Sequence, residues 1–317
     1  MFPLALLTPV LTPDLPSPAA QPQGPSNLRL RVIWGAIAAA GLFGCTFAGP
    51  YTFGLFFAAV QAVMLKEFYR IMRAEGLKPA FWLGIGLSIL LFGIIWEAAW
   101  LRQPMGSSPL AMAVAPTFKQ QLVAVGAVLV LLPTLLILRE IQAWPREGKP
   151  TSPFVSIGVT LLGLLYVSLP MALLNSIAFT QLGEYAPRHV FLLIFLIWAA
   201  DTGAYFAGKN FGRHKLAPSI SPGKTWEGWA GGALLTLAVG WAAGFAVPDI
   251  SLGHRLVAAG VVAVFGPLGD LAESMLKRSA GVKDSGTFLP GHGGLLDRFD
   301  AFLLVLPVLA LLQALAG

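Results

Sequence analysis

Residues 189–207 read HVFLLIFLIWAADTGAYFA, and this run indicates what solvent the protein folds in. As a helix rising 1.5 Å per residue, it is nearly long enough to cross the ~30 Å hydrocarbon layer of a membrane. The run contains one acid, Asp201, and no Lys or Arg. A carboxylate at membrane depth is costly unless it is paired, metal-bound or facing water, so it is a functional candidate by default. The run therefore predicts a membrane helix with a functional acid near its inner end.

Comparable apolar runs recur along the whole chain. Of its 317 residues 56% are hydrophobic and 11% charged, whereas a soluble domain carries roughly 25% charged residues on its surface. This excludes a soluble enzyme, a disordered chain and a nucleic-acid-binding domain. The predicted fold class is an all-α polytopic membrane protein with about nine transmembrane helices, placed at 32–49, 51–66, 80–101, 120–138, 153–178, 189–207, 226–247, 255–270 and 301–316.

The basic residues predict the orientation of these helices. With a cytoplasmic N-terminus, 17 of the 21 Lys and Arg residues fall on the cytoplasmic side, and only Arg102, Lys119, Arg188 and Arg255 fall on the other. Short cytoplasmic loops of membrane proteins carry such an excess of Lys and Arg. The C-terminus is then expected outside. The net charge of +6 needs no nucleic acid as a partner.

The domain organisation follows the same pattern. Residues 1–27 hold seven prolines, one acid and no Lys or Arg, which predicts a disordered N-terminal extension, with a cleaved secretory signal as the alternative. Residues 28–190 are expected to form the first five helices. Residues 191–317 are expected to form the last four, with catalytic loops on the cytoplasmic side. The single cysteine, Cys45, excludes an intrachain disulfide and a cysteine-based metal site.

A polar stripe marks the end of the eighth predicted helix. Its members recur at helical spacing, which places them on one face: Asp270, Glu273, Ser274, Lys277 and Arg278. One interpretation is an ion-pair ladder on a solvated face. The other is a site, with acids near the bilayer and cations further out.

The segment that follows adds a glycine-rich loop and two more acids. Glycines surround His292 in the run from Pro290 to Gly294, and such a loop lets backbone N–H groups approach an anion. Asp297 and Asp300 open the last predicted helix. Helix capping accounts for one aspartate there. With Asp270, the two could form an all-oxygen site suited to Mg²⁺.

The loop 221–228, SPGKTWEG, superficially matches a nucleotide-binding P-loop. The match fails because the glycine required five positions before Gly223 is Pro218 and no strand is predicted before it. Lys224 can still bind phosphate as a point charge. Alternatively, it is a cytoplasmic lysine that only sets topology.

These motifs together resemble the signature of the phosphatidate cytidylyltransferases, also called CDP-diacylglycerol synthases. The resemblance covers Ser274 to Arg278, Lys283-Asp284, His292-Gly-Gly and Asp297-Arg-Phe-Asp300, and two further blocks lie around Asp201 and at 221–228. Residues 50–190 match the family only in general hydrophobic character, and the Pro-rich N-terminus lies outside the match.

The resemblance implies that CTP and phosphatidate give CDP-diacylglycerol and pyrophosphate with Mg²⁺ and a possible second cation. It also implies a homodimer in the cell inner membrane. The distribution of basic residues predicts that the active site lies on the cytoplasmic side. The expected catalytic residues are Lys277, Arg278, Lys283, Asp284 and His292. The expected metal ligands are Asp270, Asp297 and Asp300. The expected substrate-binding residues are Asp201, Ser221, Lys224, Thr225, Glu227, Glu273, Ser274, Gly293, Gly294 and Arg298.

The residue types suit that chemistry. A phosphate monoester is already largely anionic at neutral pH, so catalysis would depend on metal ions, cationic clamps and positioning rather than on a general base. A CTP-dependent polyprenol kinase is the nearest alternative and would need a base, such as His292 or Asp284. A secondary transporter would instead show repeats and polar residues at mid-membrane. A lipid scaffold without catalysis would not need the array of acids and bases.

Overall fold

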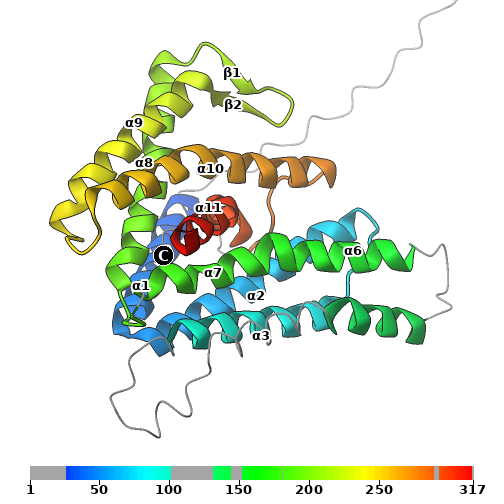
Figure 1. Ribbon diagram of the computed structural model, residues 1–317. Coiled ribbons are helices and arrows are strands. Elements are labelled where there is room, and N and C mark those ends of the chain that lie inside the picture. The colour runs from blue at the N-terminus through cyan, green and yellow to red at the C-terminus, as the bar shows by residue number, and fades with distance from the viewer. Residues whose placement is uncertain (1–25, 101–130, 144–151, 181, 289–292, 316–317) are drawn as a thin grey trace, which may run out of the picture.

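The computed structural model describes residues 26–100, 131–143, 152–180, 182–288 and 293–315. Within these ranges the chain is almost entirely helical (Figure 1). Besides a helical segment at 131–142, the α-helices are α1 (Ser26–Ala48), α2 (Pro50–Ala74), α3 (Phe81–Trp100), α6 (Pro153–Gly163), α7 (Leu169–Ala178), α8 (Pro187–Phe211), α9 (Trp226–Ala242), α10 (Leu252–Ser279) and α11 (Leu296–Leu315).

Apolar helices long enough to cross a bilayer make this a multi-pass membrane protein. Six such spans lie within the described ranges: Phe81–Trp100, Pro153–Ala178, Pro187–Phe211, Trp226–Phe245, Leu252–Ser279 and Leu296–Leu315. The apolar part of α1, Val32–Ala48, is shorter. Nine spans and the orientation of the termini stay predictions. Residues 1–25 of the predicted extension 1–27 and part of the span 120–138 lie outside the described residues, and the last two residues of that extension belong to α1.

The chain departs from the all-α expectation at a short hairpin. Strands β1 (Lys215–Ala217) and β2 (Ser221–Thr225) pair antiparallel just before α9. Strands of three and five residues, one of them containing a proline, are too short to show the alternating pattern that predicts a strand. The hairpin leads directly into α9, because the Thr225 hydroxyl accepts a hydrogen bond from the Gly228 N–H (3.1 Å) and so caps that helix.

A second departure lies inside the predicted span 153–178. Residues Leu164–Ser168 form a π-helical turn between α6 and α7. Such turns are rare in proteins, and those that do occur often lie at functional sites. The turn places Ser168 in a buried polar chain, in which the Ser168 hydroxyl donates to the Ser88 hydroxyl (2.8 Å) and the Gln61 amide donates to the same oxygen (2.8 Å). These bonds join α2, α3 and the π turn.

Helices α8 and α9 lie side by side along much of their length (Figure 1). Gly203 of α8 faces Gly231 and Gly232 of α9, and a Cβ at Gly232 would lie 2.6 Å from the carbonyl oxygen of Ala200. Small residues allow such close backbone approach between membrane helices, where packing and hydrogen bonds drive association. This pairing positions both Asp201 and the hairpin.

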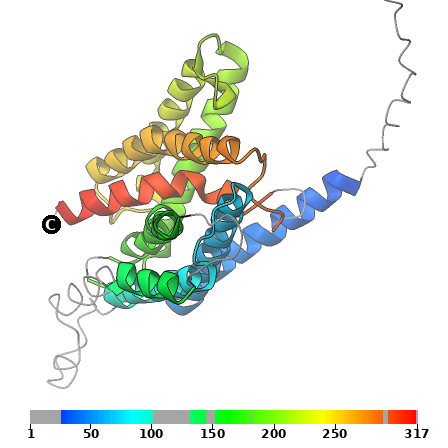
Figure 2. The ribbon, with the colours of Figure 1, turned by 90° about the vertical axis from the view of Figure 1, so that its right-hand side faces the viewer.

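Helices α10 and α11 form the second close pair. They run antiparallel beside each other, so that the end of α10 and the start of α11 lie together (Figure 2). The hairpin of β1 and β2 lies over α10, on the side of α10 that faces away from α11 (Figure 1).

Enlarging Gly232 is expected to destabilise the protein. In Gly232→Leu the added side chain meets the α8 backbone, and such overpacking typically costs about 1–3 kcal/mol. The matched control is Gly260→Leu in α10, where a Cβ would meet nothing within 4 Å. Thermal unfolding in detergent should show a lower midpoint for Gly232→Leu than for the control. Equal midpoints would show that the α8–α9 contact is not tight.

Candidate active site

The site depends on Gly269, which has no side chain and so allows two helices to approach closely. This residue of α10 lies against the backbone of α11, and a Cβ there would be 3.0 Å from the Cα atom of Ala301 and 3.1 Å from the carbonyl carbon of Asp300. The Cβ would also lie 2.5 Å from the carbonyl oxygen of Asp300, a distance that requires the backbone to move. The two helices therefore meet at this point because residue 269 is glycine, and Asp270 comes to lie beside Asp300.

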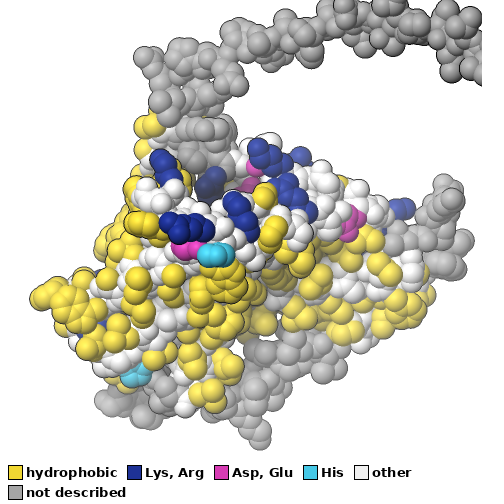
Figure 3. Space-filling model, turned by 90° about the horizontal axis from the view of Figure 1, so that it is seen from above, with side chains coloured by type: hydrophobic (Ala, Val, Ile, Leu, Met, Phe, Trp, Pro, Cys, Tyr) yellow, Lys and Arg dark blue, Asp and Glu magenta, His cyan; other side chains and the backbone are white. Residues whose placement is uncertain are grey.

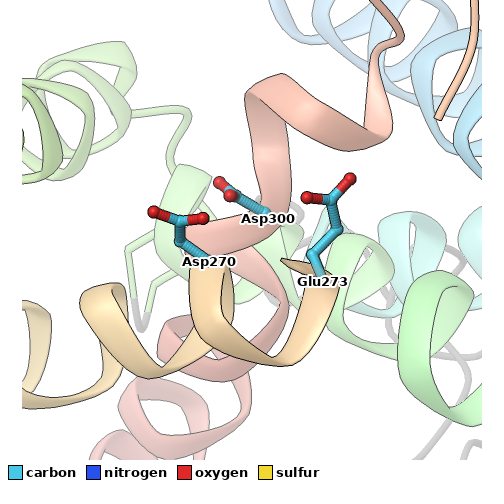
Figure 4. A group of neighbouring side chains, drawn as sticks. All are labelled: Asp270, Glu273 and Asp300. Atoms are coloured by element: carbon cyan, nitrogen blue, oxygen red, sulfur yellow. The ribbon is translucent and has the colours of Figure 1, made fainter. Parts of the chain in front are cut away.

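Three carboxylates converge where the helices meet. Asp270 and Glu273 of α10 and Asp300 of α11 each offer an oxygen, and these oxygens all lie within 4.8 Å of one another. The three side chains extend to the same side of the helix pair (Figure 4). Glu273 is almost completely buried. A compact group of carboxylate oxygens is the donor set that Mg²⁺ prefers.

This cluster contains two of the three acids expected as metal ligands. The third, Asp297, here accepts hydrogen bonds from the Gly294 N–H (2.9 Å) and the Ser285 N–H (3.1 Å). Asp297 thereby holds the loop that precedes α11. Glu273, and not Asp297, is the third carboxylate of the cluster. A role of Asp297 as a metal ligand stays a prediction.

Lys277 connects the end of α10 with the start of α11. Its ammonium lies 2.5 Å from Glu273 Oε2 and 2.7 Å from Asp297 Oδ1. The ion pair with Glu273 four residues earlier is the intrahelical pair that the sequence suggested as one interpretation. It does not lie on a solvated face, because the Glu273 side chain is only 1% exposed.

Lys224 reaches the acid cluster from the hairpin. Its ammonium lies 2.5 Å from Asp270 Oδ2 and donates to the carbonyl oxygen of Pro267 (3.2 Å). Asp201 of α8 lies near enough to Asp270 and Lys224 to interact with both electrostatically. Four segments distant in sequence thus meet at one point and bring Asp201, Lys224, Asp270 and Asp300 together.

A proline in α10 strengthens this junction. Pro267 has no N–H, so the carbonyl of Ala263 one turn earlier loses its helical partner. The indole N–H of Trp229 in α9 donates to that carbonyl (2.8 Å). The start of α9 and the hairpin before it are therefore tied to α10 about two turns before Asp270.

Other predicted residues have local partners. The Ser274 hydroxyl donates to Asp270 Oδ1 (3.2 Å), which orients a cluster member. The Glu227 carboxylate lies 2.6 Å from His214 Nδ1 and accepts the Arg213 N–H (3.1 Å), so it supports the base of the hairpin. Ser221 pairs with Ala217 in the hairpin.

The remaining predicted residues lie in or beside the loop before α11. Gly294 is buried, and Gly293 has a φ of 84°, which favours glycine. His292 lies outside the described residues. Four charged residues are exposed: Arg278, Lys283, Asp284 and Arg298.

Glu67 in α2 is a residue of this region that the sequence did not indicate. Its buried carboxylate accepts hydrogen bonds from the Leu296 N–H (2.8 Å) and the Ser285 hydroxyl (3.2 Å). Gly286 and Gly294 lie directly against it, and a Cβ at either position would force the Glu67 carboxylate to move. Glu67 thus anchors both ends of the loop before α11. Its partners are more than 200 residues away, so no local pattern could reveal it.

Tyr166 is the second residue that the sequence missed. It lies in the π-helical turn and interacts electrostatically with Glu273 and Asp300. Its hydroxyl is buried and has no hydrogen-bond partner among the described residues. The π turn is the feature that brings this hydroxyl towards the cluster.

The charges gather on one part of the surface. Seen from above, Lys and Arg side chains with Asp and Glu among them form a band along one side, and hydrophobic side chains cover most of the rest (Figure 3). This distribution fits a protein with one polar end and a lipid-facing body.

Comparison with known proteins identifies relatives along most of the chain. The model of the cytidylyltransferase family matches residues 29–316. A phosphatidate cytidylyltransferase of Bacillus subtilis is 35% identical over 91% of this chain and 98% of its own length. The corresponding proteins of Staphylococcus saprophyticus and Staphylococcus aureus are 36% and 37% identical over 72% of this chain and 90% of theirs.

Removing one carboxylate charge should weaken binding of a divalent cation. Asp300→Asn leaves the shape of the cluster intact and removes one anionic ligand, so Mn²⁺ affinity measured by electron paramagnetic resonance on purified protein should fall by about tenfold or more. Asp249→Asn, beyond the opposite end of α10, is the control and should bind Mn²⁺ like the unmodified protein. Unchanged affinity in Asp300→Asn would remove Asp300 from the metal site.

Proposed function

The chain belongs to the cytidylyltransferase family, and from that premise we propose that it transfers the cytidylyl group of CTP to phosphatidate. The carboxylate cluster with Lys224 beside it carries the proposal. A reaction between two polyanions needs concentrated cationic charge at one point, which Lys224 and a Mg²⁺ ion held by the carboxylates would supply. The names of the relatives favour phosphatidate as the acceptor. They also favour this activity over the polyprenol kinase and the transporter.

In the proposed reaction a phosphate oxygen of phosphatidate attacks the α-phosphorus of CTP. One P–O bond forms to give CDP-diacylglycerol, and the bond between the α-phosphorus and the bridging oxygen breaks to release pyrophosphate. The attacking oxygen is already anionic at neutral pH. The protein therefore has to overcome charge repulsion and align the reactants, and no residue has to remove a proton.

Asp270, Glu273 and Asp300 are the residues that would hold Mg²⁺, because their oxygens converge within 4.8 Å. A bound Mg²⁺ supplies neutralisation of the phosphate charge. Ser274 orients Asp270 through its hydroxyl, and Lys277 holds Glu273 in place. Asp297 as a further ligand and a second cation belong to the proposal as well.

Lys224 is the cation best placed to bind the nucleotide phosphates. It lies on the hairpin, which joins α8 to α9, and its ammonium contacts Asp270. Arg278 lies at the end of α10 and Lys283 in the loop before α11, and both side chains are exposed. We assign these to phosphate binding. From the family signature, His292 is a further candidate, and Asp284 is a candidate for orienting Lys283 or adding a metal ligand.

The proposed location follows from the substrates. The acyl chains of phosphatidate stay in the bilayer while CTP arrives from water, so the site has to lie at a membrane surface. The charge distribution of the sequence favours the cytoplasmic side of the inner membrane. The homodimer implied by the family resemblance stays a prediction.

The direct test is turnover by detergent-purified protein given CTP, phosphatidate and MgCl₂. Pyrophosphate and lipid-linked CMP should appear together, and only when both phosphatidate and the metal are present. Diacylglycerol and a polyprenol serve as control acceptors. A phosphorylated acceptor with release of CDP would instead identify a kinase.

Replacing Lys224 should weaken the use of CTP. Lys224→Gln removes a cation that contacts Asp270, and loss of one charged hydrogen bond of about 1.5–3 kcal/mol corresponds to a decrease in kcat/KM of roughly 10- to 150-fold. Lys209→Gln is the control, because the Lys209 ammonium lies over the ring of Tyr205 at 5.8 Å, away from the cluster. An equal effect of both substitutions would contradict a specific role of Lys224.

A further inference from the structure

An apolar cavity of about 520 Å³ lies on the other side of α11 from the carboxylate cluster. Helices α1, α2, α8 and α11 and the loop before α11 contribute its walls, among them Trp34, Phe56, Trp198, Phe288 and Phe302. Its volume falls within the range of roughly 300–1,000 Å³ that is typical of ligand pockets.

One face of α1 forms a wall of this cavity. Trp34, Ala38 and Gly41 all line it, and their spacing of four and three residues places them along one side of the helix. At Gly41 a Cβ would only reach ordinary contact with the Phe56 ring at 3.7 Å. Because Ala38 and Gly41 are small, the cavity stays open between the side chains of Trp34 and Phe56.

A single charge borders this apolar space. Among the described residues that line it, Arg298 is the one charged side chain. It is exposed, so its guanidinium lies at the rim. The preceding residue, Asp297, contacts Lys277 on the side of the carboxylate cluster. The cavity and the cluster therefore lie back to back across the first turn of α11, and a helix with its side chains is only about 10–12 Å wide.

An apolar volume with a cation at its rim is complementary to an amphiphile with an anionic headgroup. Arg binds phosphate by paired hydrogen bonds, and aromatic and aliphatic walls suit a hydrocarbon chain. We infer that this cavity seats an acyl chain of the phosphatidate substrate, with the lipid phosphate at Arg298 and directed over the first turn of α11 towards the carboxylate cluster. The inference rests on the function proposed above.

A second apolar cavity of about 590 Å³ does not meet the same requirements. His189, Asp249 and His254 line it, and it borders the start of α10 and the end of α11. That position is at the far end of both helices from Asp270 and Asp300. The Asp249 carboxylate would also repel an anionic headgroup. The cavity beside Arg298 is therefore the one that fits the lipid substrate.

The test is to fill the cavity and compare phosphatidates of different chain length. In Ala38→Trp, KM for dioleoyl phosphatidate should rise about tenfold or more, because burial of only two methylene groups corresponds to about a tenfold change in affinity. KM for CTP and the kinetics with water-soluble dihexanoyl phosphatidate should stay within about twofold. Gly41→Leu, a smaller filling substitution, should act in the same direction.

Ala258→Trp is the matched control, because Ala258 lines the second cavity. It should leave the kinetics with both phosphatidates unchanged. Arg298→Gln should raise KM for both chain lengths, since the two lipids share the phosphate, and should leave KM for CTP unchanged.

Three results would overturn the inference. Equal losses with long and short chains in both filling variants, with unfolding midpoints like that of the unmodified protein, would show that the cavity does not hold the acyl chain. Unchanged KM for dioleoyl phosphatidate would show that the cavity holds no substrate chain. Turnover of neither phosphatidate by the unmodified protein would refute the proposed function itself, a failure that the first two results do not produce.

Discussion

The close approach of α10 and α11 at Gly269 is the constraint on which the site depends. A side chain at this position would meet the backbone of Asp300 and Ala301, and the helices would have to separate. Because they do not, Asp270 and Glu273 on one helix converge with Asp300 on the other. The contact of Lys224 with Asp270 and the bridge from Lys277 to Asp297 both rely on the same alignment.

The acids of this region divide into two groups with different tasks. Glu67 accepts the N–H of Leu296, the first residue of α11, and Asp297 accepts the N–H of Gly294 in the loop before it. These two carboxylates therefore support the loop. Asp270 and Asp300 direct oxygens towards one another and towards Glu273. Burying so many carboxylates is tolerable because cations, N–H groups or a bound metal compensate their charge. The supports hold the loop so that the cluster has one defined shape.

Much of the fold and part of the site could be predicted from the sequence. Hydropathy located the apolar helices, and helical spacing put Asp270 and Glu273 on one face. The choice between Asp297 and Asp300 as the partner of Asp270 depends on how α11 is rotated, which the Gly269 contact decides. Spacing along one chain segment contains no such information. Glu67 and Tyr166 come from helices far away in sequence, so only the packing of α2 and of the π turn reveals them.

The most direct test of the central claim is the Mg²⁺ dependence of turnover in Gly269→Ala compared with Gly260→Ala. Both substitutions add one methyl group to α10, but only the first one meets α11. The account predicts that the Mg²⁺ concentration for half-maximal rate rises about tenfold or more in Gly269→Ala, because its carboxylates are spread apart. It predicts no change in Gly260→Ala. The same Mg²⁺ dependence in both folded variants would contradict the claim that this helix contact builds the metal site.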